Sequence, residues 1–198
     1  MSNALSPGRP RDPRTDAAIL SAAQEVLVED GYSGLTFDAV ARRAGVTRPT
    51  IYRRWPSRLH LAYEAAFRDD DGAAVTDTGN FQADLDALVR ASVASYSRPA
   101  TRAAMPGILA EFQRNPETRA QLREPHESEV RARFSAVVAG AVARGEVSAD
   151  VDSDVLFDTI VGAIQFRLIV AERPDDAFVK GLTELVQRGT RPAESDRT

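Results

Sequence analysis

The chain has 198 residues, a net charge of −4 and no cysteine, and 43% of its residues are hydrophobic. This length allows one or two small domains, and the apolar fraction is that of a folded protein rather than a disordered one. The absence of cysteine excludes disulfides, thiolate metal sites and a cysteine nucleophile, and the absence of long apolar runs excludes membrane spans, so we expect a cytoplasmic protein.

Residues 1–13 are rich in proline and polar side chains, which predicts a flexible basic arm. The stretch Gly-Arg-Pro-Arg at 8–11 resembles short hooks whose arginines lie in the narrow minor groove of A·T tracts. In that case Arg9 and Arg11 would add affinity more than sequence preference. A basic leader without a groove contact is the alternative.

Helical periodicity begins near Thr15, which we expect to cap a first helix that ends at Gly31. The next N-cap candidates are Thr36, Thr47 and Ser57. The predicted helices that follow these caps are 37–44, a short helix through residue 53, and 57–68. The acidic, glycine-containing stretch 69–80 is predicted to be a loop.

Residues 36–58 contain six arginines and one acid, a net charge of +5 in a protein that is acidic as a whole. Gly45 lies between the second and third predicted helices and supplies the left-handed residue that a sharp turn needs. The segment therefore predicts a helix-turn-helix that presents a basic helix to DNA. The alternative is a helical hairpin with a solvated basic face.

The third predicted helix carries the side chains that would read the DNA. Arg48 and Thr50 suit base edges in the major groove, and Pro49 suits a thymine methyl. Tyr52 suits a phosphate, although its ring could instead pack within the domain. The full set of DNA-binding candidates is Thr36, Thr47, Arg48, Pro49, Thr50, Tyr52, Arg53, Arg54 and Arg58. Of these, Arg53, Arg54 and Arg58 are expected to contact phosphates. Arg58 and Thr36 each lie at the start of a helix, where the backbone amides also favour an anion.

Four motifs occur in this order along residues 19–67: Glu-Asp-Gly-Tyr, Ala-Val-Ala-Arg-Arg-Ala-Gly-Val, Thr-Ile-Tyr-Arg-Arg-Trp and Ser-Arg-Leu-His-Leu. With them, residues 19–67 resemble the N-terminal domain of TetR-type repressors. Trp55 stands where phenylalanine is commoner in that family and Arg58 where lysine is usual, and both changes keep the physical role. Ala-Arg-Gly-Glu-Val at 143–147, the Asp-rich 150–154 and the Gly162, Phe166 and Arg167 positions are similar to the C-terminal domains of one branch of the family.

The resemblance implies an all-helical homodimer. Each N-terminal domain would enter the major groove of a palindromic operator, and each C-terminal domain would bind a small molecule. From residue 81 onward the pattern is indeed helical and no alternating strand pattern appears. We therefore expect an all-α protein with a helix-turn-helix domain at 14–56, a helical body at 57–190 and a flexible tail at 191–198. The predicted body helices are 81–97, 101–113, 116–123, 126–144, 152–172 and 175–189.

Helix 152–172 is apolar on more than one face, so it must be buried on two sides. Together with helix 175–189 it predicts a four-helix dimer interface. A monomeric core that wraps the helix completely is the alternative.

Prolines at 99, 106, 116 and 125 are expected to break the middle of the body into short helices and so favour a cavity. For each lining candidate, ordinary packing is the alternative, and Arg167 could pair with an acid across the dimer. The candidates are Tyr96, Met105, Ile108, Phe112, Phe134, Val138 and Phe166, with Gln165, Arg167 and His126 as polar groups.

The chain has no phosphate-binding glycine loop, nucleophile elbow or cofactor fingerprint. Its two histidines, His60 and His126, lie in different predicted domains without metal-ligand spacing. We therefore expect no enzyme activity, no metal and no cofactor. The sequence predicts a nucleoid-associated transcriptional repressor that binds its operator as a dimer and is released by a small molecule. A DNA-binding regulator without such an effector, architectural or partner-regulated, is the alternative.

Overall fold

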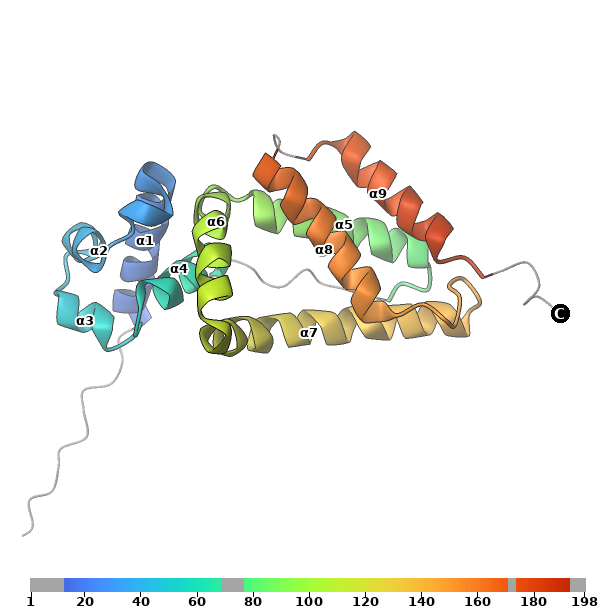
Figure 1. Ribbon diagram of the computed structural model, residues 1–198, viewed down its shortest axis with the longest axis horizontal. Helices are drawn as coiled ribbons and strands as arrows, with labels where there is room; N and C mark the ends of the chain where they lie inside the picture. The colour runs from blue at the N-terminus through green and yellow to red at the C-terminus, as the bar shows by residue number, and fades with distance from the viewer. Residues whose placement is uncertain (1–12, 69–76, 171–173, 193–198) are drawn as a thin grey trace, which may run out of the picture.

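The computed structural model describes residues 13–68, 77–170 and 174–192, apart from the side chains of 123–126. Within these ranges the chain is helical and contains no strand, which confirms the all-α prediction (Figure 1). The predicted arm with Arg9 and Arg11, most of the loop 69–80 and most of the tail lie outside the described residues. The helices are α1 Pro13–Gly34, α2 Phe37–Ala44, α3 Arg48–Tyr52, α4 Arg58–Phe67, α5 Phe81–Ser97, α6 Pro99–Arg114, α7 Pro116–Ala143, α8 Ser153–Val170 and α9 Asp176–Gly189.

Two of the predicted N-caps are confirmed, and the first helix differs from its prediction. The Thr36 hydroxyl accepts a hydrogen bond from the Ala39 amide at 3.1 Å, and Ser57 caps α4 in the same way. Thr47 begins α3 without a side-chain cap. The helix begins at Pro13, so Thr15 lies inside it instead of capping it. Gly31, with a φ of 68° and a ψ of −174°, ends the first helical run as predicted, and a further turn continues beyond this kink to Gly34.

Pro99 and Pro116 begin new helices, as predicted, but Pro106 and Pro125 do not interrupt theirs, so the expected division into short helices is wrong at these two positions. Pro99 and Pro116 occupy the first turns of α6 and α7, where the missing N–H costs nothing. Pro106 and Pro125 lie inside these helices, and α7 runs through 28 residues where two separate helices were predicted. Apolar side chains are buried close to Pro106, notably Ala104 and Ile108 in α6, and this packing outweighs the lost hydrogen bond.

The buried side chains form two clusters. The first joins α1, α2, α3 and α4 with one face of α6, and the second joins α5, α7, α8 and α9. Helix α6 stands between the helix-turn-helix and the rest of the body and packs against both α1 and α4 (Figure 1). Helix α4, which the sequence assigned to the body, therefore shares its core with the N-terminal helices.

Helices α8 and α9 lie in the part of the body remote from α3 (Figure 1). The inner face of α8 is buried through Leu156, Ile160 and Ile164. Its outer face leaves large apolar side chains in contact with solvent, and α9 adds one more. These exposed residues are Val155, Phe166, Ile169, Val170 and Leu185. No helix in the described part of the chain is long and apolar enough to cross a membrane.

Candidate DNA-binding site and effector cavity

The turn between α2 and α3 is built on Gly45. Its φ of 66° and ψ of 31° place it in the left-handed region, and its amide donates to the Ala41 carbonyl. The Val46 amide donates to the same carbonyl at 3.0 Å. These two hydrogen bonds to the same carbonyl end α2, and the chain turns sharply into α3. Val40 and Ile51, both fully buried, then hold α2 and α3 against α1.

Arg48, at the start of α3, is exposed and preorganised by two neighbours. Its Nε lies 3.1 Å from Asp38 Oδ1, and its Nη2 donates to the Tyr52 hydroxyl at 3.2 Å. The Tyr52 ring packs edge-on against Phe37 at 4.5 Å, yet the residue is 50% exposed. Tyr52 therefore packs its ring within the domain, while half of the residue stays exposed beside Arg48, and its phosphate contact remains a prediction.

The remaining polar candidates of the recognition helix lie beside Arg48. Thr47 and Pro49 are exposed, and Thr50 is half-buried. The hydroxyls of Thr47 and Thr50 are 3.0 Å apart and share one hydrogen bond. Thr36 is also exposed, and its hydroxyl keeps a proton to donate after accepting from the amide of Ala39.

Arg53 and Arg54 are neighbours in sequence but lie in different surroundings. Arg53 is exposed and makes no ion pair with any residue that the structure describes. The Arg54 side chain is only 15% exposed, pairs with Asp16 of α1 and donates to the Thr50 carbonyl at 3.4 Å. The predicted phosphate role of Arg54 does not fit this placement, because the guanidinium is already used to join α3 to α1.

Arg58 also pairs with an acid from another helix, but it is more exposed than Arg54. Its Nη2 lies 2.6 Å from Glu111 Oε1 of α6, and its guanidinium stacks 4.5 Å above the Tyr32 ring. Burial is the largest single influence and raises the pKa of Glu111, but the contacts with Arg58 and Tyr32 and the positive charge of Arg114 together outweigh it, so this pKa lies below its usual value. The Arg58 cation is therefore held by the body on one side, while 42% of its side chain stays exposed, and its phosphate contact remains a prediction.

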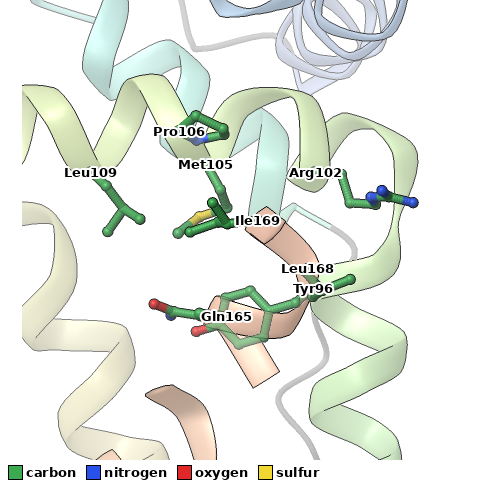
Figure 2. A pocket seen from close by; sticks show the side chains of 8 residues that line it. All are labelled: Tyr96, Arg102, Met105, Pro106, Leu109, Gln165, Leu168 and Ile169. Carbon is green, nitrogen blue, oxygen red and sulfur yellow. The ribbon is translucent and has the colours of Figure 1, made fainter. Parts of the chain in front are cut away.

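A cavity of about 120 Å³ lies between α5, α6 and α8 (Figure 2). Its walls are mostly apolar, with the amide of Gln165 and the ring of Tyr96 turned toward its centre in Figure 2 and the guanidinium of Arg102 turned away. No acidic side chain lines it. The lining residues are Tyr96, Arg102, Met105, Pro106, Leu109, Gln165, Leu168 and Ile169.

Three of the predicted lining residues, Tyr96, Met105 and Gln165, are thus brought together, and the others are not. Ile108 and Phe112 are buried in the first cluster, and Phe134 and Val138 in the second, because their helix faces point into the cores. Phe166 is 67% exposed on the outer face of α8. Arg167 is exposed and stacks 5.4 Å from the Phe178 ring centre. The side chain of His126 lies outside the described residues.

Sequence reasoning missed several residues of these sites. Leu109 and Leu168 lie one helical turn from Met105 and Gln165, so helical spacing was a usable signal. Tyr32 and Glu111 carried no such signal, because they are separated by 79 positions and meet only in the folded chain. Among the described side chains, no cluster of three or more metal-ligating groups occurs.

Comparisons with known proteins agree with this geometry. The family model of bacterial regulatory proteins, tetR family, matches residues 19–65, and that of the tetracyclin repressor-like C-terminal domain matches residues 75–186. The chain is 33% identical over 190 residues to an uncharacterised HTH-type transcriptional regulator of Mycobacterium tuberculosis, covering 88% of this chain and 93% of the relative.

A second relative is the DNA-binding transcriptional repressor TetR of Mycobacteroides abscessus, 31% identical over 194 residues, covering 88% of this chain and 95% of the relative. Among solved structures, the TetR family transcription regulator SCO0332 superposes with a TM-score of 0.68 at 34% identity, over 90% of this chain and 100% of that one. With a helix-turn-helix and a helical body that both match, the chain belongs to the TetR family of transcriptional regulators.

Proposed function

We propose that this protein is a repressor that binds a palindromic operator as a homodimer and is released by a small molecule. The observation that carries the proposal is that Arg48, Tyr52 and Arg53 are exposed and Thr50 is half-buried along a short helix and its C-cap, which the core holds in place. Arg48 and Thr50 would read base edges, while Tyr52 and Arg53 would contact phosphates. Such a protein would act in the cytoplasm, at the nucleoid.

The dimer would form through α8 and α9. Five of the exposed positions of α8 follow one stripe with alternating spacings of four and three residues: Val155, Thr159, Gly162, Phe166 and Ile169. This spacing places them on one side of the helix, opposite the buried face. A large apolar stripe on a soluble helix is costly unless a partner covers it, and a second copy of the same stripe is self-complementary about a two-fold axis.

The effector would bind in the cavity between α5, α6 and α8. The cavity volume approaches that of an engineered apolar cavity, about 150 Å³, that binds benzene. Dimeric DNA binding and ligand response are typical of the family. The alternative, a regulator without an effector, predicts that no compound that occupies the cavity changes operator binding.

Arg48→Ala should lower operator affinity by about 1–3 kcal/mol and relax the base preference at one position of each half-site. The reason is that the substitution removes a bidentate hydrogen bond to one base, while the surface pairs of Arg48 contribute little to stability. Operator variants at that position, titrated by fluorescence anisotropy, provide the measurement.

Arg53→Ala is the matched comparison for this experiment. It should weaken binding to every sequence and reduce the slope of log K against log salt by about 0.9 for each phosphate that the side chain no longer neutralises. If neither substitution changed affinity or specificity, α3 would not be the recognition helix.

Filling the cavity should abolish the ligand response. We expect small neutral compounds of about benzene size, such as benzene or phenol, to raise the melting temperature by about 5 °C at about 100 times Kd. Leu109→Trp would occupy their space and remove this shift, whereas Val28→Trp, at an exposed apolar position of α1, would leave it intact. Equal shifts in both variants would place the compounds elsewhere.

A further inference from the structure

Three charged or aromatic side chains from three helices meet where the helix-turn-helix joins the body. Arg58 begins α4, Glu111 lies near the end of α6, and Tyr32 lies just beyond the kink in α1. Arg58 is held from two sides, by the carboxylate of Glu111 at 2.6 Å and by the ring of Tyr32 at 4.5 Å. We call these three residues the Arg58–Glu111–Tyr32 cluster.

A glycine on α6 gives independent evidence that this contact is close. A Cβ atom placed on Gly107 would lie 2.1 Å from Cγ of the Tyr32 ring and 2.2 Å from its Cδ1. Only glycine therefore allows the ring to lie this near to α6. The same helical stretch contacts Tyr32 through Gly107 and Arg58 through Glu111, so the aromatic and ionic contacts act on one piece of α6.

We propose that Arg58 is a positioning residue that sets the angle between the helix-turn-helix and the body through Glu111 and Tyr32, and that it is not a phosphate ligand. The inference rests on the proposed function, because the angle matters only if two recognition helices must match one operator. A cation shared by a carboxylate and an aromatic face has few other orientations open to it. The cluster therefore restricts rotation of α1 and α4 against α6.

The opposite side of the same stretch of α6 lines the cavity. Met105, Pro106 and Leu109 face the cavity, within two helical turns of the residues that hold Tyr32 and Arg58. Pro106 has no amide proton, so α6 lacks one hydrogen bond at this point and deforms there more easily. A compound in the cavity could thus shift Gly107 and Glu111 together and change the angle that the cluster sets.

The test compares Glu111→Gln with the wild-type protein on DNA that the wild type itself selects from a random pool. Three readouts are needed: affinity for the full operator, affinity for a single half-site, and affinity for operators with one or two base pairs inserted between half-sites. The expected result is a loss of spacing preference of about threefold to thirtyfold, with unchanged half-site affinity and unchanged salt dependence. Arg90→Gln, which breaks an exposed ion pair of similar geometry within the body, is the matched control and should alter none of these readouts.

A second variant keeps the proposal testable if Glu111→Gln is poorly folded. The exchange Arg58→Glu with Glu111→Arg restores the ion pair with reversed charges and should recover the spacing preference. If Arg58 instead binds phosphate, the exchange would weaken binding to every DNA and lower the salt slope by about 0.9 for each phosphate involved, which would overturn the inference. Loss of half-site binding by the wild type itself would contradict the proposed function, which is a separate outcome.

Discussion

Phe166→Glu is expected to convert the dimer into a monomer and to lower operator affinity by about 100-fold or more. Phe166 is 67% exposed in the single chain and lies in the middle of the apolar stripe of α8. In a two-fold interface the substitution occurs twice and buries two carboxylates that lack partners. A monomer loses the gain in affinity that comes from binding two linked half-sites, which is about 10²–10⁴. Sedimentation equilibrium and operator titration measure the two effects.

Two further variants define where the interface lies. Leu185→Glu, at the exposed apolar position of α9, should give the same monomer, because α8 and α9 would form one continuous surface. Val28→Glu introduces the same charge at an exposed apolar position of α1 and should leave the molecular mass unchanged. A Phe166→Glu protein that stayed dimeric would show that this stripe is not the dimer interface.

Gly107→Ala is expected to destabilise the protein by about 1–3 kcal/mol, although alanine is the better helix former by about 1 kcal/mol. The added methyl group would lie 2.1 Å from the Tyr32 ring, so the ring or α6 must move. Because Tyr32 contacts Arg58 and packs against the first core cluster, a displaced ring would also disturb the contact between the helix-turn-helix and the body. Urea denaturation measures the loss as a lower midpoint with an unchanged slope.

The steric effect of the added methyl group on stability can be separated from the effect of the change in helix propensity. In a Tyr32→Ala background, Gly107→Ala should cost nothing or stabilise, because the ring that it would meet is gone. Gly189→Ala, at a position where an added Cβ meets no atom within 4 Å, should change the free energy of unfolding by no more than about 1 kcal/mol. Destabilisation by Gly107→Ala that persisted without the ring would refute the steric explanation.

The local features of the helix-turn-helix were predictable because each depends on residues close in sequence. Thr36 and Ser57 cap their helices through amides three residues away, and Gly45 adopts the left-handed conformation that the turn needs. Trp55 was expected to act as a bulky apolar plug, and it is 3% exposed. The all-α class and the family also followed from these short motifs.

The interior prolines show where local rules fail. A proline inside a helix is costly by itself, so a break at Pro125 was the local expectation, although the predicted helix 101–113 already ran through Pro106. The packing of α6 and α7 against several helices at once supplies more free energy than one lost hydrogen bond, and a single stretch of sequence does not contain that information. The predicted cavity residues Ile108 and Phe134 entered the cores for the same reason.

The sequence by itself determined the caps of α2 and α4, the turn at Gly45, the basic character of α3 and the membership of the TetR family, because these depend on side chains within a few positions of one another. Only the tertiary structure decided what each arginine contacts. Arg53 makes no ion pair with a described residue and Arg48 pairs with Asp38 of the neighbouring α2, whereas Arg54 pairs with Asp16 and Arg58 with Glu111. The physical reason is that a guanidinium binds whichever carboxylate the fold brings within reach, and the acids that bind Arg54 and Arg58 come from distant helices, α1 and α6.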